Sequence, residues 1–204
     1  MRPGFFFSIA LHALNAALLA TLIKKMLPAS SRMFAFLCGL AWLLSPFNSE
    51  AVVWGATEHY LLVFTFILLC MHYFFEYMHS QTKYAALLVH VFMVLAMLTF
   101  EQAIVLPALL FCGYLYFSRG ESNAVSLRKV MCTIFLPQVF LVFIYYLIIK
   151  IRVGNWVGHY GEKAHFNFGF ELIVSNLGRY IFKLSGTHFF YEWRDACACV
   201  FRIF

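Results

Sequence analysis

The acidic residues that could do chemistry gather near one short stretch between two apolar runs. Glu50 and Glu58 lie there eight positions apart, with His59 beside them. Carboxylates at the boundary of a bilayer are costly to keep, so they mark a candidate site. With Glu101, which follows another apolar run, they predict an acidic cluster suited to a divalent cation or a general base. A solvated connector with an aromatic anchor, or paired structural acids, would explain the same pattern.

A second set of residues with chemical potential is basic. Lys150, Arg152, His159 and Lys163 follow the last long apolar run, on what the loop charges predict to be the external side. Cations kept on the side where positive charge is disfavoured suggest an anionic partner, and a lipid phosphate is the obvious one. Side chains that reach from a span end to the membrane interface explain the same residues.

The composition restricts the class of protein that could carry these sites. Of 204 residues, 63% are hydrophobic and 12% are charged, whereas soluble domains are about 25% charged. The chain is therefore predicted to be an integral membrane protein with the lipid bilayer as its partner. Its net charge of +6 mainly reports which loops are cytoplasmic, because Lys and Arg gather there. No basic stripe of the kind that binds a nucleic acid is present in the sequence. No metal motif or disulfide framework is present, so a divalent cation at the acids is the only cofactor suggested.

The apolar runs predict an all-α, polytopic single module, 1–204, with about six spanning helices. A span needs about 20 mostly apolar residues, or fewer where the bilayer thins. The predicted spans are 5–23, 33–47, 60–78, 84–100, 102–118 and 130–150. Glycines then predict an external loop over 151–169. Apolar spacing over 171–185 predicts a helix along the membrane surface, and a helix packed on its neighbours fits nearly as well.

The charges of the connections orient these spans. Seven basic residues fall in the first, third and fifth connections, namely Lys24, Lys25, Arg32, Lys83, Arg119, Arg128 and Lys129. The alternate side receives four, namely Arg2, Lys150, Arg152 and Lys163. Basic residues gather in cytoplasmic loops. The first set is therefore predicted to be cytoplasmic, and the stretch 46–60 external.

Several other polar or irregular residues are predicted to be structural. His12, His72 and His90 match no metal motif, so each is expected to find a backbone or side-chain partner within the bundle. Pro107 and Pro137 are predicted to kink spans in a way that neighbouring helices absorb. Glu76 is predicted to do no more than pair with Lys83.

Four stretches of the chain match, in order, the segments of one protein family. LHALNAALLATLIKK corresponds to a second span with H-A-L-N, and SPFNSEAVVW to an H-P-x-x-x-E-x-V-x-W segment. LTFEQAIVLPALL corresponds to S-K-E-x-x-x-x-x-P, and VGHYGEKAHFNFG to a G-x-Y-G loop. The matching residues are Pro46, Glu50, Val52, Trp54, Glu101, Pro107, Tyr160 and Gly161. Together the stretches resemble the GT-C membrane glycosyltransferases, most closely the transmembrane-and-tetratricopeptide protein O-mannosyltransferases and their bacterial relatives.

This resemblance implies transfer of a mannose-like sugar from a polyprenyl-phosphate donor to an extracytoplasmic or lumenal acceptor, such as a protein Ser or Thr. Glu50 and Glu101 would support the active site. Ser45 and Phe100 stand where the family has His and Lys, and 58–60 replaces its R-x-D. The family's catalytic aspartate lies in a loop before the matched part.

We therefore expect an internal fragment of such an enzyme, incomplete at both ends and lacking the first span and catalytic loop. The membrane would be a bacterial inner membrane or the endoplasmic reticulum. The alternative is a catalytically inactive scaffold or partner subunit that retains the fold. A small transporter would need a polar path across the bilayer, whereas most of the acids here cluster on one side.

Overall fold

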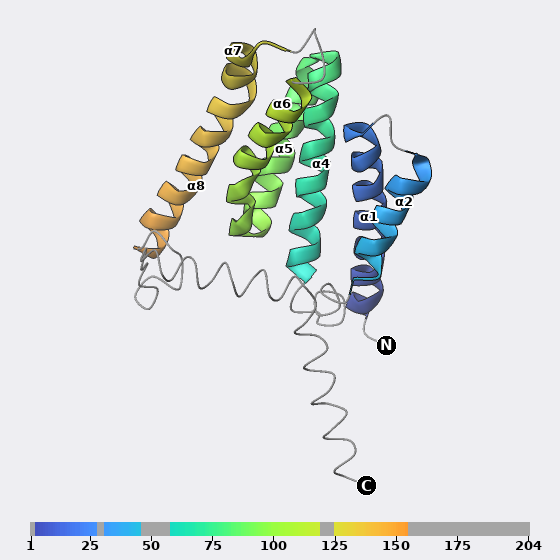
Figure 1. The fold of residues 1–204 in the computed structure, drawn as a ribbon. Coiled ribbons are helices and arrows are strands. Elements are labelled where there is room, and N and C mark those ends of the chain that lie inside the picture. Colours follow the sequence, from blue (N-terminus) through green and yellow to red (C-terminus); the bar gives the residue numbers. More distant parts are fainter. Residues whose placement is uncertain (1–2, 28–30, 46–57, 119–124, 155–204) are drawn as a thin grey trace, which may run out of the picture. The chain divides into compact units, whose positions relative to one another are not determined.

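A computed structural model describes residues 3–27, 31–45, 58–118 and 125–154 (Figure 1). Throughout these residues the regular structure is helical, with no strand. The six longer helices are α1 (Pro3–Met26), α2 (Arg32–Leu43), α4 (Glu58–Ser80), α5 (Lys83–Thr99), α6 (Leu106–Ser118) and α8 (Leu136–Val153). Three short segments complete them, namely the 3₁₀ helix η3 (Glu101–Val105), α7 (Leu127–Val130) and the π-helix η4 (Met131–Phe135). The all-α prediction is confirmed.

Four helical segments are long and apolar enough to cross a membrane. They are Phe5–Met26, Glu58–Ser80, Glu101–Ser118 and Leu127–Val153. The other two predicted spans are shorter apolar helices, α2 with 12 residues and α5 with 17. At 1.5 Å per residue, α2 is about 18 Å long, less than the roughly 30 Å of a bilayer core.

Two predicted boundaries differ from the structure because of single residues. The span predicted over 33–47 ends as a helix at Leu43, since Pro46 disfavours helical backbone at the residue before it. The loop predicted to begin at 151 begins later, because α8 continues to Val153. Gly154, with φ +81°, is the first residue that readily leaves the helix.

Hydroxyl side chains cap the N-termini of α2 and α5. The Ser31 hydroxyl accepts a hydrogen bond from the Phe34 N–H at 3.1 Å, and the Thr82 hydroxyl accepts one from the Ala85 N–H at 3.3 Å. Each satisfies one of the N–H groups that a helix leaves unpaired in its first turn. Between α4 and α5, Gln81 has φ 52°, which allows the tight turn that joins these two helices.

Within the compact unit Met1–Ile148, α4 lies between two neighbours. Helix α5 packs extensively along one side of α4, and α1 packs along another side of α4. Helix α2 in turn packs on α1 (Figure 1). The main core gathers α4, α5, α6 and η4 around fully buried side chains such as Phe74, Val89, Met93, Leu110 and Ile134. A smaller cluster of Leu22, Leu68 and Phe75 joins α1 to α4.

Both helix prolines follow an irregular turn, and at each of them another group donates to the carbonyl that the proline cannot reach. Pro107 cannot donate to the Ala103 carbonyl, and the Leu106 N–H bonds to that carbonyl instead, at the end of η3. Pro137 cannot donate to the Thr133 carbonyl, and His90 Nε2 bonds to that oxygen at 3.0 Å from α5. At Pro137, a neighbouring helix thus supplies the absent donor.

Candidate functional site

Two of the predicted catalytic acids begin helices. Glu58 is the first residue of α4, half-buried, and its Oε1 accepts a hydrogen bond from the Ser8 hydroxyl at 3.3 Å. Glu101 is the first residue of η3 and is also half-buried. A carboxylate is favoured at a helix N-terminus, where the backbone N–H groups give partial positive charge. This preference accounts for both positions without reference to catalysis.

Aromatic contacts bring these two acids to the same end of the unit. The Phe100 ring lies 5.1 Å from the His59 ring and 4.9 Å from the Tyr60 ring, between centroids. The residue directly before Glu101 therefore packs on the first turn of α4, which Glu58 begins. We call this end, defined by Glu58 and Glu101, the acidic end. That these acids form one cluster stays a prediction.

The acidic end combines carboxylates with hydroxyl groups. The Ser8 hydroxyl donates to the Glu58 carboxylate at 3.3 Å. Such groups can accept hydrogen bonds from a polyhydroxylated ligand such as a sugar. Among the described residues, no three His, Cys, Asp or Glu side chains are placed to hold a metal ion. A divalent cation would therefore need further ligands besides these acids.

The predicted phosphate-binding cations are only partly described. Lys150 and Arg152 lie in the last turn of α8 and are exposed. Cations are favoured there because they complement the helix dipole. The remaining predicted site residues, Pro46, Glu50, Trp54, His159, Tyr160, Gly161 and Lys163, lie outside the described residues, as does the predicted surface helix 171–185.

A line of polar contacts between α1 and α4 was not expected from the sequence. Asn15 is fully buried, donates to the Leu61 carbonyl at 2.9 Å and accepts from the Thr65 hydroxyl at 2.7 Å. One turn later along α1, His72 Nε2 bonds to the Leu18 carbonyl at 2.9 Å. Interhelical bonds of this kind are how polar side chains are accommodated in membranes.

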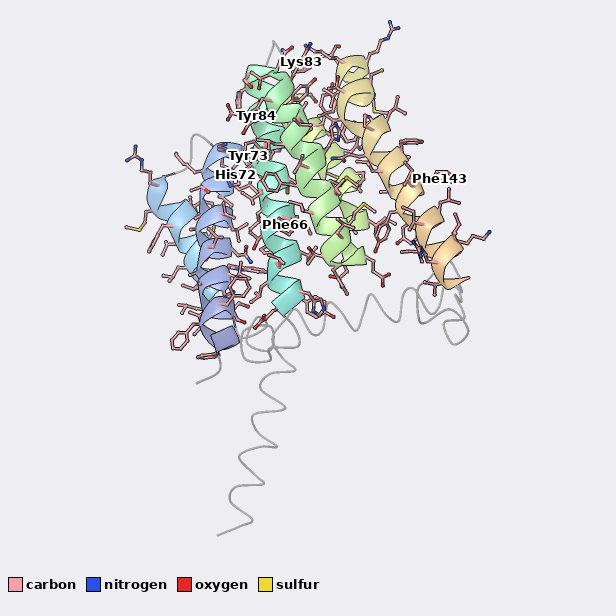
Figure 2. The ribbon with its side chains drawn as sticks, turned by 180° about the vertical axis from the view of Figure 1, so that it is seen from behind. Phe66, His72, Tyr73, Lys83, Tyr84 and Phe143 are labelled. Atoms are coloured by element: carbon pink, nitrogen blue, oxygen red, sulfur yellow. The ribbon has the colours of Figure 1, made fainter. Side chains whose placement is uncertain are left out.

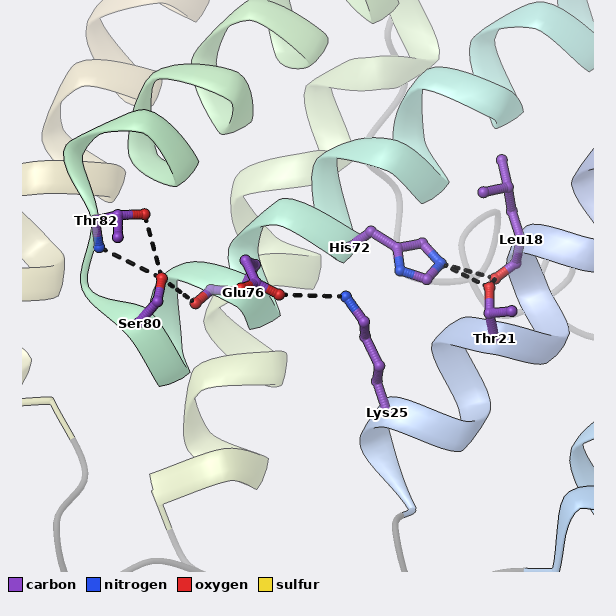
Figure 3. A network of polar contacts seen from close by, with 7 residues as sticks. All are labelled: Leu18, Thr21, Lys25, His72, Glu76, Ser80 and Thr82. Atoms are coloured by element: carbon purple, nitrogen blue, oxygen red, sulfur yellow. Dashed lines mark hydrogen bonds and ion pairs between the residues drawn. The ribbon is translucent and has the colours of Figure 1, made fainter.

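The line continues to the far end of both helices, where Lys25 Nζ lies 3.6 Å from a Glu76 carboxylate oxygen (Figure 3). From Ser8 with Glu58 to Lys25 with Glu76, residue numbers rise together on α1 and α4. The two helices are therefore parallel. The predicted pairing of Glu76 with Lys83 is wrong, because Glu76 lies on the face of α4 that packs on α1.

Three histidines have main-chain partners within the bundle, as predicted. His12 Nε2 bonds at 3.0 Å to the carbonyl of Leu43, the last residue of α2. That carbonyl is one of the four that a helix C-terminus leaves without an intrahelical partner. His72 and His90 bond to main-chain oxygens of α1 and η4 in the same way. The signal for such interhelical bonds was a histidine in the middle of an apolar run, because its ring nitrogens must find partners there.

A cavity of about 500 Å³ lies at the opposite end of α4, against α1 and α5. We call this the basic end, defined by Lys25, Lys83 and Lys129. There the Lys129 ammonium donates to the Gln81 side chain across the connections. The sequence did not single out this cavity, since its lining comes from three different helices.

A scan against protein-family models and searches of curated proteins and solved structures found no match to the chain. The similarity to GT-C glycosyltransferases therefore rests on the four sequence stretches, and it stays a prediction.

Proposed function

We propose that this chain is a multi-pass transmembrane module of a GT-C-type glycosyltransferase. It would act in the transfer of a mannose-like sugar from a polyprenyl-phosphate donor to an acceptor outside the cytoplasm. The observation that supports this function best is the acidic end, where Phe100 packs on the first turn of α4 and brings Glu101 to the end at which Glu58 lies.

The chemistry required of these acids is modest. A carboxylate that accepts hydrogen bonds from sugar hydroxyls orients the donor, and one that accepts the acceptor's proton acts as a general base. The exposed cations Lys150 and Arg152 in the last turn of α8 would bind the donor phosphate. A polyprenyl chain would lie against the apolar helix faces, which expose side chains such as Phe140 and Phe143.

The test uses a polyprenyl-phosphate mannose that carries a photoreactive group, with the chain in lipid nanodiscs. We expect specific photolabelling of the chain, competed by unlabelled donor and weakened several-fold by Glu101→Gln and by Glu58→Gln. The loss follows because a hydrogen bond to a charged group contributes about 1.5–3 kcal/mol, whereas one to a neutral amide contributes about 0.5–1.5 kcal/mol. Glu76→Gln, at the basic end, is the matched control and should label as the wild type does.

A second candidate is a membrane scaffold or partner subunit without catalytic activity. It is favoured by the contacts of the motif residues, since Glu58 accepts from Ser8 while His12 and Asn15 bond to carbonyls of α2 and α4. The transferase proposal would be contradicted if the chain labels no more strongly than an unrelated helical membrane protein and if neither Glu58→Gln nor Glu101→Gln changes the labelling. A stable protein partner recovered with the chain would then support the scaffold.

A further inference from the structure

The cavity at the basic end has one helix as its floor and two as its walls. Leu69, His72, Glu76 and Ser80 line it from α4 at steps of three or four residues, so they share one face of that helix. Leu18 and Lys25 line one side from α1, and Tyr84 and Ala85 line the other from α5. Figure 2 shows His72, Tyr73 and Tyr84 on this face of the unit.

The lining changes character along the cavity. Leu18 and Leu69 make one part apolar, whereas Lys25, Glu76 and Ser80 bring a cation, an anion and a hydroxyl to the other. Tyr84 is 68% exposed at the start of α5, an amphipathic ring at a position where membrane proteins commonly place Tyr and Trp. An apolar channel with a polar mouth suits a ligand that has a hydrocarbon tail and a polar head.

The charged pair at the mouth is open to a ligand. The 3.6 Å between Lys25 and Glu76 exceeds the usual length of about 2.7–2.9 Å for a charge-assisted hydrogen bond. Their side chains are 42% and 52% exposed. Each charged group therefore keeps hydrogen-bonding capacity that a ligand can use.

His72 adds an acceptor beside this pair. Its Nε2 lies 2.9 Å from the Leu18 carbonyl oxygen, which can only accept, so Nε2 carries the proton and Nδ1 of the neutral ring is an acceptor. Figure 3 shows the Nδ1 edge of the ring on the side of Lys25 and Glu76. The mouth thus offers one cationic donor and two neighbouring acceptors.

We propose that this cavity binds the head group of a zwitterionic phospholipid with a primary amine, a phosphoethanolamine lipid. The phosphate bonds to the Lys25 ammonium, and the lipid ammonium donates to the Glu76 carboxylate and to His72 Nδ1. The acyl chains lie along Leu18 and Leu69. One cation and one anion in the lining favour a head group without net charge over an anionic one.

This lipid site is independent of the proposed glycosyl transfer, since it lies at the basic end and uses neither Glu58 nor Glu101. The experiment is native mass spectrometry of the purified chain with phosphatidylethanolamine, phosphatidylcholine and phosphatidylglycerol in turn. Soluble glycerophosphoethanolamine is a fourth arm, which separates recognition of the whole lipid from recognition of the head group alone. We expect phosphatidylethanolamine to bind about fivefold more tightly than phosphatidylcholine, whose methylated amine cannot donate to Glu76.

Variants of Lys25 and Glu76 test whether this pair causes the preference for phosphatidylethanolamine. Glu76→Gln should abolish the preference for phosphatidylethanolamine over phosphatidylcholine, and Lys25→Met should weaken binding of every phospholipid. Lys24→Met, which removes the neighbouring charge outside the cavity lining, is the control and should leave the preference intact. The double exchange Lys25→Glu with Glu76→Lys restores the ion pair and hence any structural role, yet it should not restore the preference, because the charges have changed places.

Three results would overturn the assignment. Equal binding of all three lipids would show that no head group is recognised, and tighter binding of phosphatidylglycerol would show that the site selects anionic lipid. A preference for phosphatidylethanolamine that survives Glu76→Gln would place the recognition elsewhere on the chain. If glycerophosphoethanolamine binds as tightly as the intact lipid, the acyl chains contribute nothing to binding at this site.

Discussion

At the scale of single residues, buried polar side chains in this chain act as links between helices. Asn15 is the clearest case, because it is fully buried and both ends of its amide are bonded to α4. Thr65 bonds both to Asn15 and, at 2.9 Å, to the Leu61 carbonyl of its own helix. An apolar residue at either position leaves the other side chain with fewer partners.

The coupling between Asn15 and Thr65 is measurable. In a double-mutant cycle of Asn15→Ala and Thr65→Val, we expect a coupling energy of about 0.6 kcal/mol and no more than about 1.7 kcal/mol, the range found between membrane helices. Unfolding in mixed micelles with increasing dodecyl sulfate would give the free energies.

Thr99→Val serves as the control for this cycle. Among the described residues, the Thr99 hydroxyl bonds only to the Leu95 carbonyl of its own helix, at 2.7 Å. It should therefore show no coupling to Asn15→Ala. Coupling as large with Thr99 as with Thr65 would mean that the cycle reports general destabilisation of the bundle.

At the scale of helices, the close approach of α1 and α2 depends on Gly39. A Cβ at this position would lie 2.7 Å from the Ala16 carbonyl oxygen and 2.9 Å from the Ala20 Cβ. Neither atom can rotate away, since one is backbone and the other is a methyl group fixed to it. Small residues at such crossings let membrane helices approach closely.

Gly39→Ala should accordingly destabilise the packing of α1 on α2, by about 1–3 kcal/mol. Gly113→Ala in α6 is the matched control, because its Cβ would meet the Phe74 ring at 3.5 Å, an ordinary contact. The control should be neutral or stabilising by up to about 1 kcal/mol, since alanine favours helix over glycine. Equal loss of unfolding free energy in both variants would refute the role of close approach.

The proline of α8 and the histidine of α5 act as a pair. His90 Nε2 bonds to the Thr133 carbonyl, the oxygen that Pro137 leaves without its helical donor. His90→Leu alone should cost about 1 kcal/mol by leaving that half-buried carbonyl short of a partner.

In a Pro137→Ala background the main-chain N–H of residue 137 becomes available to Thr133. His90→Leu should then cost clearly less than in the wild-type background, a non-additivity that a double-mutant cycle of unfolding free energies measures. The same cost in both backgrounds would show that His90 acts on something other than the carbonyl freed by Pro137.

At the scale of the whole molecule, the basic end and the acidic end predict a transmembrane orientation. Single cysteines at Gln81 and Val153, in a background without the native cysteines, would test it without changing any charge. In sealed vesicles with their external side outward, an impermeant maleimide should label Val153→Cys, and it should label Gln81→Cys only after permeabilisation. The reverse pattern would invert the orientation, and labelling of both sites from one side would contradict a spanning α8.

The sequence alone predicted that the chain is helical and that it carries helices apolar enough to cross a membrane. The signals for helices are local, because a helix forms and ends through interactions within a few residues. They are the apolar runs, the hydroxyl residues before α2 and α5, and Gly154 after α8. Three histidines were also expected to have partners within the bundle, since a polar ring in an apolar run must find one, and each bonds to a main-chain carbonyl.

Tertiary structure alone decided which residues became partners. Glu76 lies beside Lys25, 51 positions away, and not beside Lys83, while His90 bonds to the carbonyl freed by Pro137. The cavity that we assign to a lipid head group also draws its lining from three helices. Such pairings depend on how each helix is rotated about its axis and which helix lies next to it. Those quantities are set by packing across the whole unit, and no short stretch of sequence contains them.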